Sequence, residues 1–206
     1  MSKGAETRRA ILDHALEVAT KEGLEGLTIG RLAQDLRLSK SGLFAHFRGK
    51  EELLLQVLET ARTRFIEQVV KPGLAAPRGE PRIRALFESW LAWERSSALP
   101  GGCPFVAAAV ELDDRPGPAR DYVVQSQKDW LEVLANSART GVQEGQFRPD
   151  FDPEQFAYEV HGAMLSYHHM ARLLRDPKAE MRVRQAFASL LVRARRPGVA
   201  PRRPDH

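Results

Sequence analysis

Several residue patterns are scarce in this chain of 206 residues, and each scarcity excludes a class of protein. A single cysteine, Cys103, excludes a disulfide framework and any metal site built from several cysteines. The longest unbroken apolar run, 105–110, is far shorter than the roughly 18 residues that a membrane-spanning helix needs. The first nine residues are charged and no apolar core follows them, so no secretory leader is expected. These absences together predict a cytoplasmic protein.

Motifs of the common catalytic sites are also missing. The chain has no Gly-x-Ser-x-Gly elbow, no Walker loop and no Gly-x-Gly-x-x-Gly run, so neither a catalytic residue nor a cofactor is predicted. His161, His168 and His169 share one predicted helix, but metal ligands on one helix face recur three or four residues apart, and these do not. We therefore predict no metal site and a structural or lining role for these histidines.

Hydrophobic residues make up 43% of the chain and charged residues 28%, the proportions of a globular protein with a buried core. The net charge of +4 is unevenly distributed, because residues 1–50 carry nine Lys or Arg against six Asp or Glu, and residues 193–206 carry five against one. The middle of the chain is acidic as a result. Basic ends suit a polyanion such as nucleic acid, although a small charge excess can serve solubility alone.

Apolar spacing and helix punctuation predict an all-α chain of about nine helices, with no strand run of period two and no hairpin signal. Gly23 is expected to end the first helix, while Thr28 and Ser39 are the expected N-caps of two short helices, the second reaching about residue 47. A fourth helix is expected from Lys50 to the Pro72-Gly73 pair. Prolines 81, 104, 118 and 153 are expected to open further helices, and the last helix covers about 177–194.

Two short helices joined by a tight turn, across residues 28–47, fit a helix-turn-helix. In that motif the second helix enters the major groove with its N-terminal residues at the base edges. Lys40 can donate to guanine, Ser39 and Ser41 can reach phosphates or bases, and Gly42 permits close approach. An ordinary helical hairpin with a serine cap has the same spacing, so spacing alone leaves both interpretations open.

The segment 38–53, Leu-Ser-Lys-Ser-Gly-Leu-Phe-Ala-His-Phe-Arg-Gly-Lys-Glu-Glu-Leu, resembles the signature of TetR-type transcriptional regulators. The resemblance covers about residues 6–60 and includes Arg8-Arg9-Ala10-Ile11-Leu12, Thr28-Ile29 and Leu32-Ala33. It implies a homodimer whose C-terminal domain binds a small molecule and thereby releases double-stranded operator DNA. The DNA-facing residues that it implies are Thr28, Ser39, Lys40, Ser41, Phe44, His46 and Lys50, and Gly42 and Arg37 join them from the motif and its turn.

Two positions depart from the family's pattern. Arg37 stands where the family usually has glycine in the turn, and a non-glycine residue in a left-handed conformation costs on the order of 1 kcal/mol. The guanidinium can add a phosphate contact in return. Phe44 stands where many members have tyrosine, so it is expected to pack rather than to donate a hydrogen bond to phosphate.

We expect three parts: a helix-turn-helix DNA-binding domain at 1–48, a helical ligand-binding and dimerisation domain at 49–195, and a disordered basic tail at 196–206. An apolar effector pocket is predicted among the fourth to eighth helices, suited to an apolar or amphipathic small molecule, although the same aromatic group is also ordinary core. Its predicted lining is Phe87, Trp90, Trp93, Phe105, Tyr122, Gln125, Trp130 and His161, with Tyr122, Gln125 and His161 as polar anchors. Cys103 lies in a Gly-Gly-Cys-Pro turn, and a redox role for it would need an exposed thiol with a lowered pKa.

The last two helices carry a long apolar face, which predicts that they pair with the same helices of a second chain in a four-helix bundle. That face comprises Phe156, Val160, Met164, Tyr167, Leu174, Met181, Phe187, Leu190 and Leu191. The predicted function is a homodimeric, sequence-specific DNA-binding repressor that is not an enzyme and that a small ligand releases from DNA. The alternative is a helical ligand-binding or enzymatic protein that binds no DNA.

Overall fold

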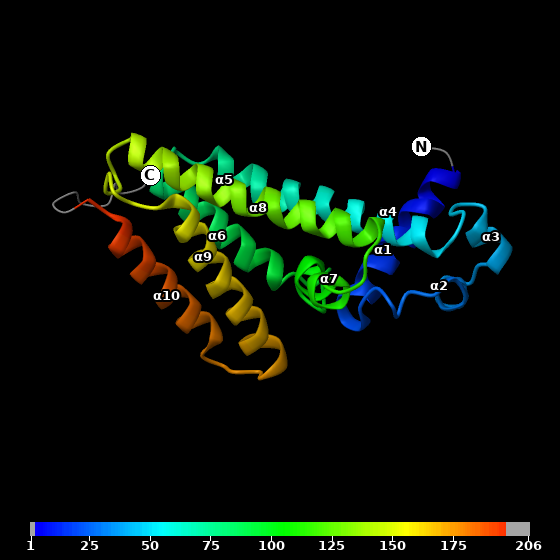
Figure 1. Ribbon diagram of the computed structural model, residues 1–206. Helices are drawn as coiled ribbons and strands as arrows, with labels where there is room; N and C mark the ends of the chain where they lie inside the picture. Colours follow the sequence, from blue (N-terminus) through cyan, green and yellow to red (C-terminus); the bar gives the residue numbers. More distant parts are fainter. Residues whose placement is uncertain (1–2, 197–206) are drawn as a thin grey trace. The chain divides into compact units, whose positions relative to one another are not determined.

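The computed structural model describes residues 3–196, which form nine continuous helices when each π-helical segment is counted with the helix that it extends (Figure 1). No strand forms within these residues. Phe147 and Arg195 are joined by an isolated antiparallel bridge. The predicted all-α class and helix number are therefore confirmed. The predicted tail lies outside the described residues, apart from Arg196.

The first helices are α1 (Lys3–Glu22), α2 (Ile29–Asp35), α3 (Lys40–Phe44), α4 (Lys50–Phe65), η1 (Ile66–Val70) and α5 (Lys71–Ala75). The remaining helices are α6 (Glu80–Glu94), α7 (Pro104–Leu112), α8 (Pro118–Gln143), α9 (Pro153–His168), η2 (His169–Leu173) and α10 (Ala179–Ala194). Most of the predicted starts are confirmed, because local cap and proline signals determine them. Asp152, for example, accepts hydrogen bonds from the backbone N–H groups of Glu154 and Gln155, each at 3.0 Å.

Two predicted helix ends are wrong. Pro72-Gly73 does not end the fourth helix, because the π-helical segment η1 follows α4 directly and Pro72 then lies in the first turn of α5. Proline is tolerated there, since the N–H groups of a first helical turn need no partner within the helix. The third helix ends at Phe44 and not near residue 47, because Ala45 is its C-cap.

Contacts divide the chain into two compact units, each described here by itself. The first unit contains the residues up to Phe65 together with Trp93–Gln127, and the second contains Ile66–Ala92 together with the residues from Lys128 onward. The DNA-binding domain predicted at 1–48 and the ligand-binding domain predicted at 49–195 stay predictions, because the contacts do not show which residues bind DNA.

In the first unit, α1 packs against both α4 and α7. The side chains of Ile11 and Leu16 are fully buried beneath these neighbours. The end of α1 also meets the turn that precedes α7, where the Gly101 N–H donates to the Thr20 hydroxyl at 3.0 Å. This turn approaches so closely that a Cβ atom at Gly101 would lie 1.6 Å from the carbonyl oxygen of Thr20.

In the second unit, α9 and α10 run side by side as an antiparallel pair (Figure 1). Phe87 stacks on Phe187 with ring centroids 3.9 Å apart, which attaches α10 to α6. The end of α10 is held by Arg195, whose guanidinium donates to both carboxylate oxygens of Glu80 at 2.6 and 2.9 Å. Burial raises the pKa of Glu80, but hydrogen bonds from Arg195 and Arg84 outweigh it and leave that pKa below its ordinary value.

Most of the predicted apolar face of the last two helices lies inside the second unit. Phe156, Val160, Met164, Tyr167, Phe187, Leu190 and Leu191 are buried within the chain. Only Leu174 and Met181 of that set are exposed. These seven residues are therefore core of the chain itself, covered by α6 and the α9–α10 contact, and the predicted pairing of the last two helices with a second chain stays a prediction.

The close approach at Gly101 gives a stability prediction. Gly101→Ala should lower the free energy of unfolding by about 2 kcal/mol or more, because the new methyl group meets backbone that cannot rotate away. Urea denaturation measures the change. Gly49→Ala is the matched control, since a Cβ atom there meets nothing within 4 Å. Equal stability of the two variants would contradict the tight contact between the turn and α1.

Candidate nucleic-acid interface

The helix pair α2–α3 is built by the two predicted side-chain caps. The Thr28 hydroxyl accepts the N–H of Arg31 at 3.2 Å, and the Ser39 hydroxyl accepts the N–H of Gly42 at 3.0 Å. These bonds satisfy N–H groups of the first helical turn, which have no acceptor within a helix of any length. Leu32 of α2 and Leu43 of α3 are fully buried, so the two helices are fixed to the first unit by their apolar sides.

The turn between these helices has the strained conformation that the sequence predicts. Arg37 has φ +54°, in the left-handed region that favours glycine. The next N–H, that of Leu38, donates to the Ala33 carbonyl at 2.8 Å and closes the turn. The Arg37 side chain is exposed beside the start of α3.

All nine residues predicted to face DNA are accessible to solvent. Gly42 and His46 are half-buried, whereas the others are exposed, namely Thr28, Arg37, Ser39, Lys40, Ser41, Phe44 and Lys50. Phe44 is 52% exposed, which is unusual for a phenylalanine and leaves its ring available to an apolar partner. The structure therefore brings together on α3 and its flanks a set of small polar, cationic and aromatic side chains.

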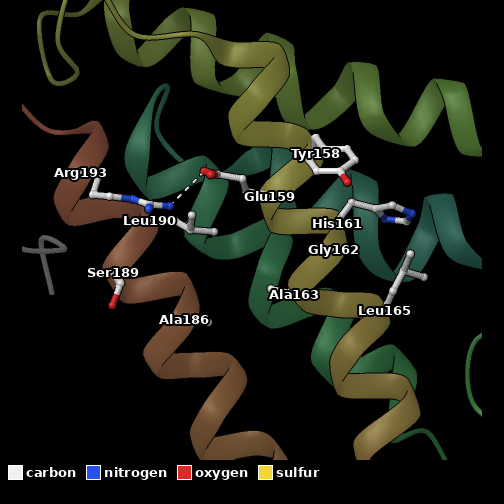
Figure 2. Close-up of a pocket in the computed structure, with 10 residues that line it drawn as sticks. All are labelled: Tyr158, Glu159, His161, Gly162, Ala163, Leu165, Ala186, Ser189, Leu190 and Arg193. Carbon is white, nitrogen blue, oxygen red and sulfur yellow. Dashed lines mark hydrogen bonds and ion pairs between the residues drawn. The ribbon is translucent and has the colours of Figure 1, made fainter.

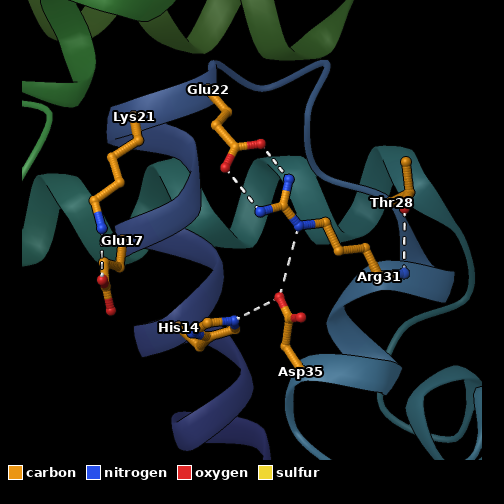
Figure 3. Close-up of polar contacts among 7 residues, drawn as sticks. All are labelled: His14, Glu17, Lys21, Glu22, Thr28, Arg31 and Asp35. Atoms are coloured by element: carbon orange, nitrogen blue, oxygen red, sulfur yellow. Dashed lines mark hydrogen bonds and ion pairs between the residues drawn. The ribbon is translucent and has the colours of Figure 1, made fainter.

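An ion-pair network fixes α2 to α1 (Figure 3). The Arg31 guanidinium binds both carboxylate oxygens of Glu22, and His14 lies 3.0 Å from the Asp35 carboxylate. The hydrogen bond from Arg31 lowers the pKa of Glu22, and the hydrogen bond from His14 lowers that of Asp35. Arg31 is thus occupied by α1, and the network holds the orientation of α2.

Lys50 also has a partner within the chain. Its ammonium group lies 3.3 Å from both the backbone carbonyl and a carboxylate oxygen of Glu25. The other carboxylate oxygen of Glu25 accepts from Arg115 at 2.6 Å. The hydrogen bond from Lys50 is the largest cause of the lowered pKa of Glu25. Lys40 differs, because among residues 3–196 no carboxylate lies within 4 Å of its ammonium group.

The residues predicted to line an effector pocket fall into both units. Trp93, Phe105, Tyr122 and Gln125 belong to the first unit, while Phe87, Trp90, Trp130 and His161 belong to the second. The five residues Phe87, Trp90, Trp93, Phe105 and Trp130 are buried, Tyr122 and His161 are half-buried, and Gln125 is exposed. In the first unit the rings of Trp93 and Phe105 both pack edge-on against Phe65.

Cys103 is buried and does not have the environment of a reactive thiol. Burial, followed by the nearby charge of Glu94, raises the pKa of its thiol to about 11. Its backbone N–H donates to the Glu94 carboxylate at 2.8 Å, which anchors the turn before α7. A redox-sensing thiol needs exposure and a lowered pKa, so the structure argues against that role.

A groove of about 540 Å³ lies between α9 and α10 (Figure 2). Of the predicted ligand residues only His161 lines it, and burial lowers the pKa of that imidazole. Glu159 and Arg193 form an ion pair at its edge, 3.1 Å apart. Leu190 was predicted only as part of the apolar face of the last helices, and the sequence analysis missed the other lining residues, Tyr158, Glu159, Gly162, Ala163, Leu165, Ala186, Ser189 and Arg193. The small residues of this set, spaced along two neighbouring helices, were the available signal.

The described residues, 3–196, contain no group of three or more His, Cys, Asp or Glu side chains placed to hold a metal ion. No helix among them is both long and apolar enough to span a membrane.

Comparisons with known proteins agree on one family. Residues 11–57 match the model of bacterial regulatory proteins of the tetR family, and residues 79–187, more than half of the chain, match that of the tetracyclin repressor-like C-terminal domain.

Two curated relatives are each 25% identical to the chain. For the HTH-type transcriptional regulator SrpR of Pseudomonas putida the match covers 73% of this chain and 68% of that protein. For the tetracycline repressor protein class D of Escherichia coli it covers 66% and 58%. The chain thus spans about three fifths to two thirds of these relatives. The solved structure of a TetR transcriptional regulator from Chloroflexus aurantiacus J-10-FL has a TM-score of 0.83 and 26% identity, with 93% of this chain and 96% of that one covered.

The left-handed turn gives a prediction about strain. Arg37→Gly should raise the free energy of unfolding by about 0.5–1 kcal/mol, because relief of left-handed strain exceeds the entropy that glycine loses on folding. Arg37→Ala is the control, since alanine removes the same guanidinium but keeps the strained conformation. Thermal and urea unfolding of the three proteins measure the difference. A stabilisation by alanine equal to that by glycine would show that the side chain, and not the backbone, is the source of the effect.

Proposed function

The chain belongs to the TetR family of bacterial transcriptional regulators, and we propose that it is a homodimeric repressor that reads its operator with α3 and leaves it when a small molecule binds. We propose no enzymatic activity for it. Because its proposed partner is chromosomal DNA, its proposed location is the cytoplasm.

The observation that carries the DNA-binding proposal is the contrast among the cations of the first unit. Arg31 and Lys50 are engaged with carboxylates, whereas Lys40 is exposed at the start of α3. The Lys40 side chain passes beside Gly30 of α2, where a Cβ atom would lie 3.4 Å from its Cε. Ser39 and Ser41 flank it with hydroxyl groups 3.1 Å apart. A lysine between two short polar side chains suits a guanine edge with a neighbouring phosphate.

The proposed dimer uses the outer faces of α9 and α10. Tyr158, Leu165 and Val192 are large side chains that are exposed on these two helices, and Tyr158 and Leu165 line the groove of Figure 2. The small residues in the groove let a second helix approach closely. A two-fold dimer would place two α3 helices at the spacing that two operator half-sites require.

The proposed effector is an apolar or amphipathic small molecule. The support is the concentration of buried aromatic side chains outside the α2–α3 pair, Trp90, Trp93 and Trp130 among them. The ligand must prefer the form that does not bind DNA, because a ligand with equal affinity for both forms shifts nothing. The predicted lining residues, including Tyr122, Gln125 and His161, remain part of this proposal.

The DNA-binding proposal is tested with an operator selected from a random duplex library. Lys40→Ala should weaken binding to that operator by about 1–3 kcal/mol and reduce the preference among base variants, because Lys40 is proposed to contact a base edge. Lys71→Ala, which removes an exposed lysine far along the sequence from α3, is the control and should change neither quantity. Lys50→Ala should instead weaken all duplexes about equally and lower the salt slope by less than one unit, because Lys50 reaches a phosphate only by giving up its contact with Glu25.

Two results would contradict the proposed DNA binding through α3. Unchanged affinity and discrimination in Lys40→Ala would remove α3 from base recognition. A wild-type chain that selects no duplex and shows no salt-sensitive binding would favour the alternative, a helical ligand-binding or enzymatic protein.

The dimer is tested by a charge placed on the proposed interface. Val192→Glu should convert a dimer to a monomer in sedimentation at micromolar concentration, because an unpaired carboxylate would be buried between the chains. Val110→Glu on α7 is the matched control, since Val110 is 75% exposed and Val192 65% exposed. A wild-type monomer, or a dimer that tolerates Val192→Glu but not Val110→Glu, would contradict the proposed interface.

A further inference from the structure

Arg8 of α1 reaches the far end of α3, across 38 residues of sequence. Its Nη1 donates to the backbone carbonyl of His46 at 2.8 Å, and its Nη2 donates to the Gln56 side-chain oxygen at 2.6 Å. The guanidinium also lies over the Phe47 ring, 5.1 Å from the ring centroid. One side chain thus contacts the backbone after α3, the aromatic anchor of the turn and the first turns of α4.

Glu52 extends this contact into a closed network. One of its carboxylate oxygens accepts the backbone N–H of Arg48 at 2.8 Å, and the other accepts the Gln56 amide at 2.9 Å. The Arg8 guanidinium is 3.9 Å from the same carboxylate. The α3–α4 turn is therefore held at His46 from α1 and at Arg48 from α4, with Phe47 buried between them.

The position of α3 depends on such outside contacts because the helix is short. Ser39 caps its start, but its C-cap residue Ala45 has no side chain that could fix the other end. A rotation of a five-residue helix about its capped end would displace Phe44 and His46 most. The Arg8 bond to the His46 carbonyl opposes that rotation directly.

We propose that Arg8 is a positioning residue for operator recognition, which sets the orientation of α3 through His46 and Phe47 and contacts no base itself. This inference rests on the proposed DNA-binding function. Arg8 is only partly exposed, at 40% of its side chain, because its planar group is occupied by the turn and by Gln56.

The test compares two neighbouring arginines of the full chain. Arg8→Met and Arg9→Met each remove one positive charge from α1, but Arg9 is 71% exposed and its carboxylate neighbour is Asp13 at 3.9 Å, one turn along the same helix. Affinities are measured for the selected operator and for a scrambled duplex at several salt concentrations. Arg8→Met should weaken operator binding by about tenfold more than Arg9→Met, the factor expected when a base contact is misplaced. The two variants should bind the scrambled duplex equally and have equal salt slopes.

Arg8→Lys separates orientation from charge. Lysine retains the charge but cannot form the two hydrogen bonds, to His46 and Gln56, and the contact with the Phe47 ring at once, so the operator affinity of Arg8→Lys should stay closer to that of Arg8→Met than to that of wild type. Full recovery by lysine, or a salt slope lowered by about one unit in Arg8→Met relative to Arg9→Met, would overturn the proposal in favour of a direct phosphate contact.

A measurement without DNA distinguishes failure of this inference from failure of the proposed function. Hydrogen exchange of the free protein should accelerate at the amides of residues 45–49 in Arg8→Met, while the amides of α6 keep their protection. Uniformly faster exchange, or no change in the turn, would overturn the positioning role. If wild type selects no duplex, the DNA-binding function fails, and with it the recognition role, whatever the exchange shows.

Discussion

Helix α3 has five residues, and a helix of that length has no stability of its own, because nucleation costs more than its few hydrogen bonds return. Its existence depends on groups outside it. The Ser39 hydroxyl satisfies its start, buried Leu43 attaches its apolar side, and the contacts of Arg8 hold the turn that follows. The ion pairs that bind α2 to α1 fix the position of α2, the helix that precedes α3. In the first unit, many long-range polar contacts thus converge on one exposed turn of helix.

The parts of this arrangement that the sequence predicted are those that local chemistry determines. The caps at Thr28, Ser39 and Asp152 each act on N–H groups two or three residues away, so a short window contains both partners. The left-handed turn at Arg37 was predictable from the family resemblance, because Arg37 stands where the family usually has glycine. Exposure of the predicted DNA-facing residues followed from the same motif.

The parts that were missed depend on partners far away in sequence. An apolar stripe indicates that a helix has a buried side, but it does not identify which helix covers that side. The stacking of Phe187 on Phe87 of the same chain, for example, could not be predicted from either helix alone. The contacts of Lys50 with Glu25 and of Arg8 with His46 span 25 and 38 residues, and no spacing rule connects such positions. The continuation of the fourth helix through Pro72 required the π-helical segment, for which the sequence offers no simple signature.

The burial of Cys103 has a practical consequence for spectroscopy. The chain has one cysteine, and its thiol is both enclosed and, with a pKa of about 11, almost fully protonated at neutral pH. Maleimide dyes and nitroxide spin labels react with the thiolate, so the native residue is a poor target for them. A cysteine introduced on an exposed helix face would then be the one readily labelled position in each copy of the proposed dimer. Distances between paired labels in solution could accordingly be measured without first replacing the native cysteine, which anchors the turn before α7.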